Sequence, residues 1–383
     1  MNLYAIKKLP AVYRTLSTAR RVSGRAWMRL QNRVHGVQPR RVFFSSFKGK
    51  AYSDSPRFIS EALHELRPDL EIVWQLSNPA DAPDYVRAVK PHSLRALTEL
   101  ATARCIVDNF NRPIHLLKFP GQLYVQTWHG DRGFKKMLYD MNDGLAYPDG
   151  AQMDLAVSGS RFGTKNFRTA FRYDGEVLQQ GMPRNDRLVH PDPAEIACIR
   201  QRLNIPENTR VLLYAPTFRD ATSGSDLKAG FDLTRAIARL SHATNQKWLC
   251  LTRAHDQNRK ITTDASDVRD MTDYPEMSDL LLIADMLITD YSSSAGDYVL
   301  LHRPVVLYQP DLSSFVQSDR DMYFDMKTCP YVRAESESAL YSLLDRPEAL
   351  IPSCQQVLDF YGATETGRST ELVAQWISDR IPQ

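Results

Sequence analysis

Short apolar runs alternate with helical stretches from about residue 41 to residue 330, and this alternation restricts the fold more than any other feature of the sequence. Most runs are β-branched or continuously apolar, as expected for parallel strands that are buried on both faces. The predicted strands are, in chain order, Arg41–Phe47, Glu71–Ser77, Cys105–Phe110, Leu123–Trp128, Leu155–Ser158, Glu176–Gln180, Val211–Ala215, Lys247–Thr252, Val268–Met271, Met286–Thr289 and Val305–Tyr308. Helical segments such as Ser55–Leu66, Ser93–Ala103 and Leu233–Ala243 separate them. This order predicts an α/β protein with doubly wound parallel sheets.

A polar, proline-rich stretch at Pro183–Pro193 interrupts this order and is the best candidate for a linker between domains. The length of 383 residues also favours two domains. We therefore expect residues 39–188 and 189–352 to form two α/β domains of similar size, with a helical segment at 353–383. Ligands of such sheets bind beyond the carboxyl ends of the strands, and often between domains.

Other features of the composition exclude several classes of protein. No apolar run approaches the ~20 residues of a spanning helix, and we expect neither such a helix nor a secretory signal. The five cysteines form no CxxC pair, so we expect reduced thiols and no zinc site.

The first 53 residues carry twelve Lys or Arg and no Asp or Glu. Apolar residues spaced by threes and fours predict a helix over residues 3–34, broken or kinked at Pro10. We interpret residues 1–38 as a basic amphipathic helix that lies on an anionic membrane surface. Two alternatives are a helix packed on its own domain and, less favoured, a nucleic-acid contact.

Polar residues follow several of the predicted strands. His129 comes just after the run that ends at Trp128, where an imidazole can move a proton near neutral pH, although a structural loop histidine would look the same. Thr217 and Arg219 follow the strand that ends at Ala215, and Arg253 and His255 follow the one that ends at Thr252. Arginine is well suited to bind phosphate, but each of these side chains could equally pair with a carboxylate of the fold.

The segment from Asp290 to Asp297 is the strongest of these signals, because an apolar strand runs directly into three serines and a helix. Hydroxyl groups and free backbone N–H groups at a helix start can hold an anion, although serine is also an ordinary N-cap. Asp311 follows the last strand and could bind a sugar hydroxyl or cap a helix. The GxxxxGK[ST], GxGxxG and HExxH motifs do not occur. Together these residues favour a diphosphate-bearing ligand held between two domains.

In this order, the motifs resemble those of the CDP-glycerol glycerophosphotransferase family, whose members build teichoic-acid and related capsule chains. The strings that carry the resemblance are Ser45–Lys50, Tyr52–Pro56, Gln126–Gly130, Gly181–Asp186, Tyr214–Arg219, Leu287–Ser293, Arg303–Tyr308 and Asp311. The resemblance implies a GT-B fold of two Rossmann-like domains, with the C-terminal helix crossing back to the first domain. It also implies transfer of a polyol phosphate from CDP-glycerol or CDP-ribitol to a lipid-linked glycan acceptor, at the cytoplasmic face of the membrane.

The resemblance also implies roles for particular residues. His129 matches the catalytic base, and His255 matches the second essential histidine, which binds the phosphates of the donor. Arg219, Ser292 and Ser293 would hold the pyrophosphate. Thr217 and Arg253 lie in the same strand-end segments, and Asp290, Asp297 and Asp311 are further candidates for the donor side. We expect no cofactor and no essential tightly bound metal.

One departure from the family concerns the residues after the first histidine motif, where Asp131 and Arg132 stand in place of Thr-Pro. A carboxylate beside the base would disfavour an anionic acceptor, and we expect Arg132 to offset this in part. Two other functions remain open: a GT-B glycosyltransferase that uses a nucleotide-sugar, and a membrane-associated binding protein without turnover.

Overall fold

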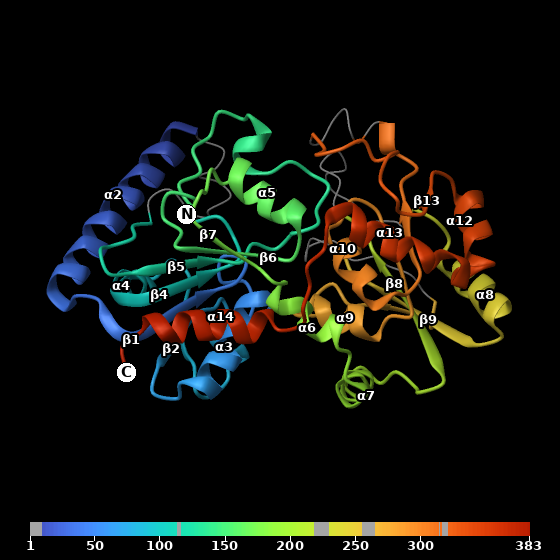
Figure 1. The fold of residues 1–383 in the computed structure, drawn as a ribbon, viewed down its shortest axis with the longest axis horizontal. Coiled ribbons are helices and arrows are strands. Elements are labelled where there is room, and N and C mark those ends of the chain that lie inside the picture. Colours follow the sequence, from blue (N-terminus) through green and yellow to red (C-terminus); the bar gives the residue numbers. More distant parts are fainter. Residues whose placement is uncertain (1–9, 113–115, 218–229, 255–264, 314, 316–320) are drawn as a thin grey trace.

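The chain folds into two α/β halves that lie side by side, each built on a parallel sheet (Figure 1). The computed structural model describes residues 10–112, 116–217, 230–254, 265–313, 315 and 321–383; of residues 10–17 it describes the helical backbone only.

The first sheet has the strand order β3-β2-β1-β4-β5-β6-β7. Its strands are β1 (Gln38–Ser45), β2 (Glu71–Gln75), β3 (Arg87–Val89), β4 (Ala103–Asp108), β5 (Leu123–Gln126), β6 (Leu155–Ser158) and β7 (Glu176–Gln179). Helices α3 (Asp54–Leu66), α4 (Leu94–Thr102) and α5 (Arg161–Thr169) connect them, with the short 3-10 turns η1 (Pro79–Asp81) and η2 (Leu138–Met141). Phe43 packs in the core on one face of the sheet and Phe44 in the core on the other, which is why the strand is continuously apolar.

The second sheet has the strand order β10-β9-β8-β11-β12-β13 and is also parallel. Its strands are β8 (Thr209–Ala215), β9 (Lys247–Thr252), β10 (Val268–Asp270), β11 (Met286–Thr289), β12 (Val305–Tyr308) and β13 (Arg333–Ala334). Its helical elements are α8 (Leu233–Thr244), α9 (Met277–Ile283), α10 (Ser294–Tyr298), η4 (Val299–Leu301), α12 (Glu337–Leu344), η5 (Pro347–Leu350) and α13 (Pro352–Tyr361). Between the two sheets run η3 (Pro183–Asn185), α6 (Asp186–Val189) and α7 (Pro193–Arg202).

The predicted fold class is confirmed, and each predicted strand is present with bounds that differ by at most three residues at either end. The prediction missed β3 and β13. Both are edge strands of only three and two residues. Segments this short carry no readable periodicity, so only their pairing with β2 and β12 reveals them.

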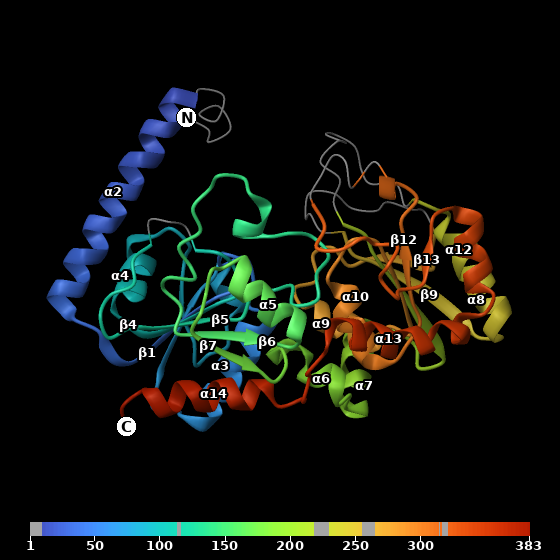
Figure 2. The same ribbon diagram turned by 45° about the horizontal axis from the view of Figure 1, so that its top comes forward.

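Helix α2 (Pro10–His35) begins at Pro10, where a proline costs no hydrogen bond; residues 3–9 of the predicted helix lie outside the described residues. The helix lies alongside α4 in both views (Figures 1 and 2). Trp27 Nε1 donates to Leu94 O at 3.2 Å and to Thr98 Oγ1 at 3.0 Å, and Met28 is fully buried. One face of α2 therefore packs on its own domain, which was one of the alternatives left open.

The chain ends in α14 (Ser369–Arg380), which leaves the second half and runs along the first (Figure 2). It packs on α3, and Val373 and Ile377 share a core with Phe44. Trp376 Nε1 donates to Glu176 Oε1 at 3.0 Å. The two halves are thus joined by two chain crossings, one before α7 and one after α13.

Candidate active site

The candidate residues follow the carboxyl ends of strands in both sheets, where a doubly wound fold places its ligands. The described ones are His129 after β5, Thr217 after β8, Arg253 after β9, Asp290, Ser292, Ser293 and Asp297 after β11, and Asp311 after β12. Two further candidates, Arg219 and His255, lie outside the described residues.

The orientation of His129 is set by a backbone carbonyl. His129 Nδ1 lies 2.7 Å from Asn109 O, at the end of β4. Because a carbonyl only accepts, this contact requires the hydrogen on Nδ1 and leaves the basic lone pair on Nε2. This is the tautomer that a general base needs.

Aromatic side chains hold the His129 ring from several sides. The ring stacks on Phe110 with centroids 5.0 Å apart and planes 3° apart, and it meets Phe47 edge-on at 5.4 Å. The ring centroid of Trp128 lies 4.3 Å from that of His129, and the backbone of Trp128 has a φ of +54°. A non-glycine residue in this region is uncommon and is typical of functional loops.

The loop that carries His129 touches the serine segment of the other half. A Cβ placed on Gly130 would lie 3.4 Å from Ser293 Oγ, and one placed on Gly133 would lie 3.8 Å from Ser293 Cβ. The histidine motif and the serine motif, about 160 residues apart in sequence, therefore meet across the domain boundary.

Within the serine segment, the three hydroxyl groups differ in their surroundings. Ser292 Oγ accepts from Ser294 N at 3.3 Å and from Ser294 Oγ at 2.9 Å. Ser293 makes no side-chain cap to α10 and is half-buried, beside the glycines of the histidine loop. Ser293 thus lies at the boundary between the two halves.

The aspartates of the second half hold strand ends together. Asp290 is buried, and its Oδ1 accepts from Thr217 N at 2.8 Å and from Tyr291 N at 2.5 Å. Asp311 Oδ1 accepts from Tyr291 OH at 3.1 Å. These contacts orient the loops after β8 and β11, in accord with a supporting role for both carboxylates.

Arg253 is half-buried at the end of β9. Its Nη2 donates to Pro275 O at 3.4 Å, while its buried Nη1 has no hydrogen-bond partner among the described atoms. Burial lowers the pKa of this guanidinium, opposed by the nearby charges of Glu276 and Asp279. An incompletely paired arginine at a strand end is suited to bind an anion.

The structure does not support the expectation that the Asp131 carboxylate, beside the base, would disfavour an anionic acceptor. Asp131 is buried, and its carboxylate accepts from Ser158 Oγ at 2.9 Å, Gly159 N at 3.1 Å and Ser160 Oγ at 2.7 Å. These donors hold the carboxylate against the turn between β6 and α5, and Arg132 Nη1, 3.4 Å from Asp131 Oδ2, supplies its counter-charge there.

Arg132 is fully buried and connects the two halves. It donates from Nε to Gly296 O at 2.7 Å and from Nη1 to Gly159 O at 3.2 Å. Its Nη2 lies 3.1 Å from Asp297 Oδ1 and 2.7 Å from Glu365 Oε1. Although burial lowers the pKa of Arg132, these carboxylates raise it above its ordinary value.

Asp297, a candidate donor ligand from sequence, is placed in this same buried network. Arg184 Nε lies 3.1 Å from Asp297 Oδ2, and Asn185 Nδ2 donates to Oδ1 at 2.9 Å. Burial raises the pKa of Asp297, but Arg184 and Arg132 outweigh this and hold it below its usual range. The contacts indicate that this carboxylate binds the domains together.

Sequence reasoning missed Glu365 altogether and gave Arg132, Arg184 and Asn185 no structural role. Glu365 Oε2 accepts from Met182 N at 2.9 Å, and burial raises the pKa of its carboxyl group. Arg184 and Asn185 lie within the resemblance string Gly181–Asp186, but no local pattern marks Arg132 or Glu365, because their partners are far apart in sequence.

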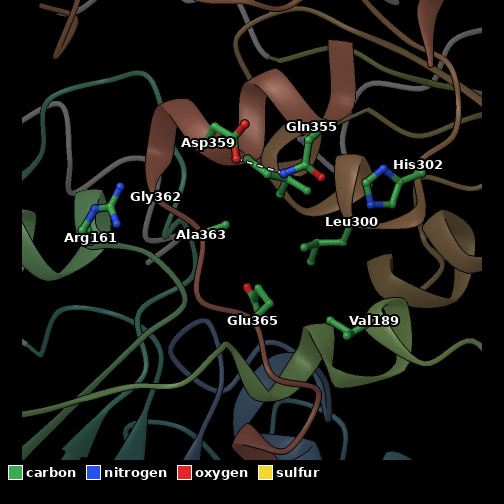
Figure 3. Close-up of a pocket in the computed structure, with 10 residues that line it drawn as sticks. Arg161, Val189, Leu300, His302, Gln355, Asp359, Gly362, Ala363 and Glu365 are labelled. Carbon is green, nitrogen blue, oxygen red and sulfur yellow. Dashed lines mark hydrogen bonds between the residues drawn. The ribbon is translucent and has the colours of Figure 1, made fainter. Parts of the chain in front are cut away.

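A cavity of roughly 430 Å³ lies beside the crossing after α13 (Figure 3). Its walls come from α5, α6, η4, α13 and the connection that follows, with Arg161, His302, Asp359 and Glu365 among the polar residues. Of the predicted site residues that the structure describes, none lines this cavity, although Glu365, which does, pairs with Arg132.

The described ranges hold neither a cluster of metal ligands nor a membrane-spanning helix. No group of three or more His, Cys, Asp or Glu in them is placed to hold a metal ion. The helices of the same part of the chain include none that is long and apolar enough to cross a membrane.

Two Rossmann-like parallel sheets, with strand-end residues facing each other across a boundary closed by a C-terminal crossing helix, define a GT-B-like fold. The chain belongs to the CDP-glycerol:poly(glycerophosphate) glycerophosphotransferase family, whose model matches residues 27–379.

Individual relatives agree with this assignment. The chain is 32% identical over 320 residues to a teichoic acid poly(glycerol phosphate) polymerase of Staphylococcus epidermidis, covering 77% of this chain and 44% of that protein. It is 32% identical over 323 residues to a teichoic acid glycerol-phosphate transferase of Staphylococcus aureus, covering 79% of this chain and 82% of that protein. It thus spans less than half the length of the first relative and most of the second. A solved structure of the wall teichoic acid polymerase TagF aligns with a TM-score of 0.83 at 28% identity, covering 100% of this chain and 98% of that one.

Proposed function

We propose that this protein transfers glycerol phosphate, or a related polyol phosphate, from a CDP-linked donor to a hydroxyl group of a membrane-linked glycan or teichoic-acid acceptor. The observation that carries the proposal is the contact between the His129 loop and Ser293, which brings a base and an anion-binding segment together from two halves. The family match supports the same chemistry.

In the proposed reaction, His129 Nε2 takes the proton of the acceptor hydroxyl as its oxygen attacks the phosphorus that bears the polyol. A P–O bond to that oxygen forms, the bond to the bridging oxygen of the diphosphate breaks, and CMP leaves with the electron pair. Ser292, Ser293, Arg253, Arg219 and His255 would bind the diphosphate, and Thr217 would lie beside it. Phosphoryl transfer requires mainly positioning and charge stabilisation, which these donors supply.

The test is release of CMP from CDP-glycerol and from CDP-ribitol, each with a lipid-linked acceptor. Acceptor-dependent CMP from either donor supports the proposal and identifies the polyol. If neither donor yields CMP and the protein binds a UDP-sugar, a glycosyltransferase is favoured instead. If neither a CDP-polyol nor a UDP-sugar is turned over although the protein binds membranes, a non-catalytic binding protein is favoured. We further propose that no tightly bound metal is essential; loss of activity with EDTA, restored by one divalent ion, would contradict this.

We also propose that the outward face of α2 binds an anionic membrane from the cytoplasmic side. Val22 is 62% exposed, and the exposed Arg25, Arg29 and Arg33 follow it at spacings of three, seven and eleven residues, which places them on one face of the helix; Leu30, 50% exposed, lies beside this face. Apolar and basic side chains on one face suit the membrane interface, where each basic residue contributes about 1 kcal/mol.

Charge reversal tests this without removing the face that packs on α4. The variant Arg25→Glu/Arg29→Glu/Arg33→Glu should no longer sediment with phosphatidylglycerol vesicles, whereas a control with Lys247→Glu and Arg346→Glu in the second half should. Equal sedimentation of both variants would rule out this membrane face.

A further inference from the structure

An unusual backbone loop places a lysine beside the candidate base. Phe47, Lys48 and Gly49 all have positive φ values, of +47°, +62° and +85°. The loop is held by Phe47 N, which donates to Asn109 Oδ1 at 2.8 Å, and by Ser77 N, which donates to Gly49 O at 2.7 Å. Consecutive left-handed residues are rare outside functional sites, since non-glycine residues are strained there.

This loop directs Lys48 to the aromatic ring that supports His129. Lys48 Nζ lies 4.3 Å from the centroid of Phe110, and Phe110 stacks on His129. The asparagine that holds the loop also supplies the carbonyl that orients His129. Lys48 and the base are thus positioned by the same residues, and the lysine is exposed.

Two more cationic groups extend from Lys48 toward α2. A Cβ on Gly49 would lie 2.8 Å from Pro91 Cγ, so the loop packs on the turn that carries His92. Burial lowers the pKa of His92, and the charges of Arg20 and Lys48 lower it further, which places both within electrostatic reach. Arg20 lies two turns before Trp27 on the same face of α2, toward α4.

No carboxylate of the described residues forms an ion pair with Lys48, His92 or Arg20, and all three side chains are exposed. Elsewhere on this half, arginines such as Arg41 and Arg87 pair with Glu71 and Glu99. Cations that are close together without a counter-charge repel one another, and a bound anion relieves that repulsion.

We infer that Lys48, His92 and Arg20 form an anion subsite that binds a phosphodiester group of the acceptor, along a path from the membrane-facing helix to His129. This inference rests on the proposed function and adds to it the acceptor side of the site. Binding of that phosphate would bring the neighbouring terminal hydroxyl to His129. The preferred acceptor would therefore already carry at least one phosphodiester.

The test uses a short, lipid-free oligo(glycerol phosphate) as probe, with glycerol as the uncharged comparison. Lys48→Ala and Arg20→Ala should each weaken binding of the oligomer roughly tenfold, as expected for loss of a charged contact, and the KM for CDP-glycerol should not change. Lys50→Ala is the matched control, because Lys50 is likewise exposed two residues away, whereas Lys48 is the lysine that lies over the Phe110 ring. The affinity of the wild type should fall with added salt.

Each outcome bears on the inference separately from the proposed function. Unchanged oligomer binding in Lys48→Ala, or equal loss in Lys50→Ala, would overturn the subsite even if CMP release is normal. Oligomer binding that depends on Lys48, without any CMP release, would support the subsite while the proposed reaction fails. If Lys48→Ala and Arg20→Ala lose binding to phosphatidylglycerol vesicles but not to the oligomer, the cluster binds lipid headgroups and the acceptor assignment is wrong.

Discussion

Replacing Arg132 by methionine should destabilise the contact between the two halves and slow the reaction. The side chain is fully buried and contacts three carboxylates and two carbonyls, from Asp131, Gly159, Gly296, Asp297 and Glu365. Methionine fills much of the same volume but leaves these acceptors without their donor. Removing one partner of a buried ion pair typically costs about 3–5 kcal/mol.

The remaining contacts place the expected loss at the lower end, about 3 kcal/mol. Arg184 still pairs with Asp297, and Asp131 keeps its hydrogen bonds from Ser158, Gly159 and Ser160. Glu365 loses its ion-pair partner and keeps hydrogen bonds from Asn185 Nδ2 at 2.9 Å and Met182 N at 2.9 Å, so we expect it to be the most destabilised of the three carboxylates.

The pH dependence of this loss follows from Glu365. Burial already raises the pKa of Glu365, and removing Arg132 raises it further. An acid whose folded pKa is raised destabilises the folded state above its unfolded pKa, and the penalty disappears as pH falls below that pKa. The deficit of Arg132→Met should therefore shrink toward acidic pH.

Urea unfolding of the wild type and of Arg132→Met at two pH values measures the effect, with CMP release as the functional readout. Adding Glu365→Gln to Arg132→Met should recover part of the stability, because it removes the uncompensated charge. Arg368→Met serves as the control, since the exposed Arg368–Glu371 pair should make no measurable difference. This account of the network would be refuted if Arg132→Met were as stable as the wild type, or if adding Glu365→Gln recovered none of the lost stability.

Three further predictions concern the site itself. His129→Ala should lower the turnover rate by about 10²–10⁴-fold while donor binding persists, as measured by CMP release and by titration with CDP-glycerol; near-normal rates would exclude His129 as the base. Gly130→Ala should have little effect, because the added Cβ lies at ordinary contact distance from Ser293. Gly130→Val should separate the two loops and cost about 100-fold in rate, and equal rates for the two variants would count against the contact. Burial raises the pKa of Asp108 to about 8, so wild-type stability should fall as pH rises toward that value. Asp108→Asn keeps an acceptor for Phe110 N and should flatten this dependence in urea unfolding at pH 6 and 9; an unchanged slope would contradict it.

Much of the architecture was predictable because it depends on local pattern. A continuously apolar strand such as β1 is buried on both faces, and this can be recognised from neighbouring residues alone. His129 and Ser293 were recognisable as candidates for the same reason, since each directly follows a buried strand. The outward face of α2 was likewise predictable from its periodicity, whereas its packing against α4 through Trp27 was not.

The two sheets, the strand ends that carry polar residues and the basic helix of residues 10–35 are thus encoded in local sequence patterns. Which charged side chains are buried between the halves depends instead on contacts between distant segments. Asp131 and Arg132 follow the candidate base by two and three residues, yet their side chains contact Ser158 and Asp297. Burying a charge is costly unless charged or hydrogen-bonding groups pair with it. The partners of Arg132 come from segments up to 233 residues away in sequence, so local pattern could not identify them.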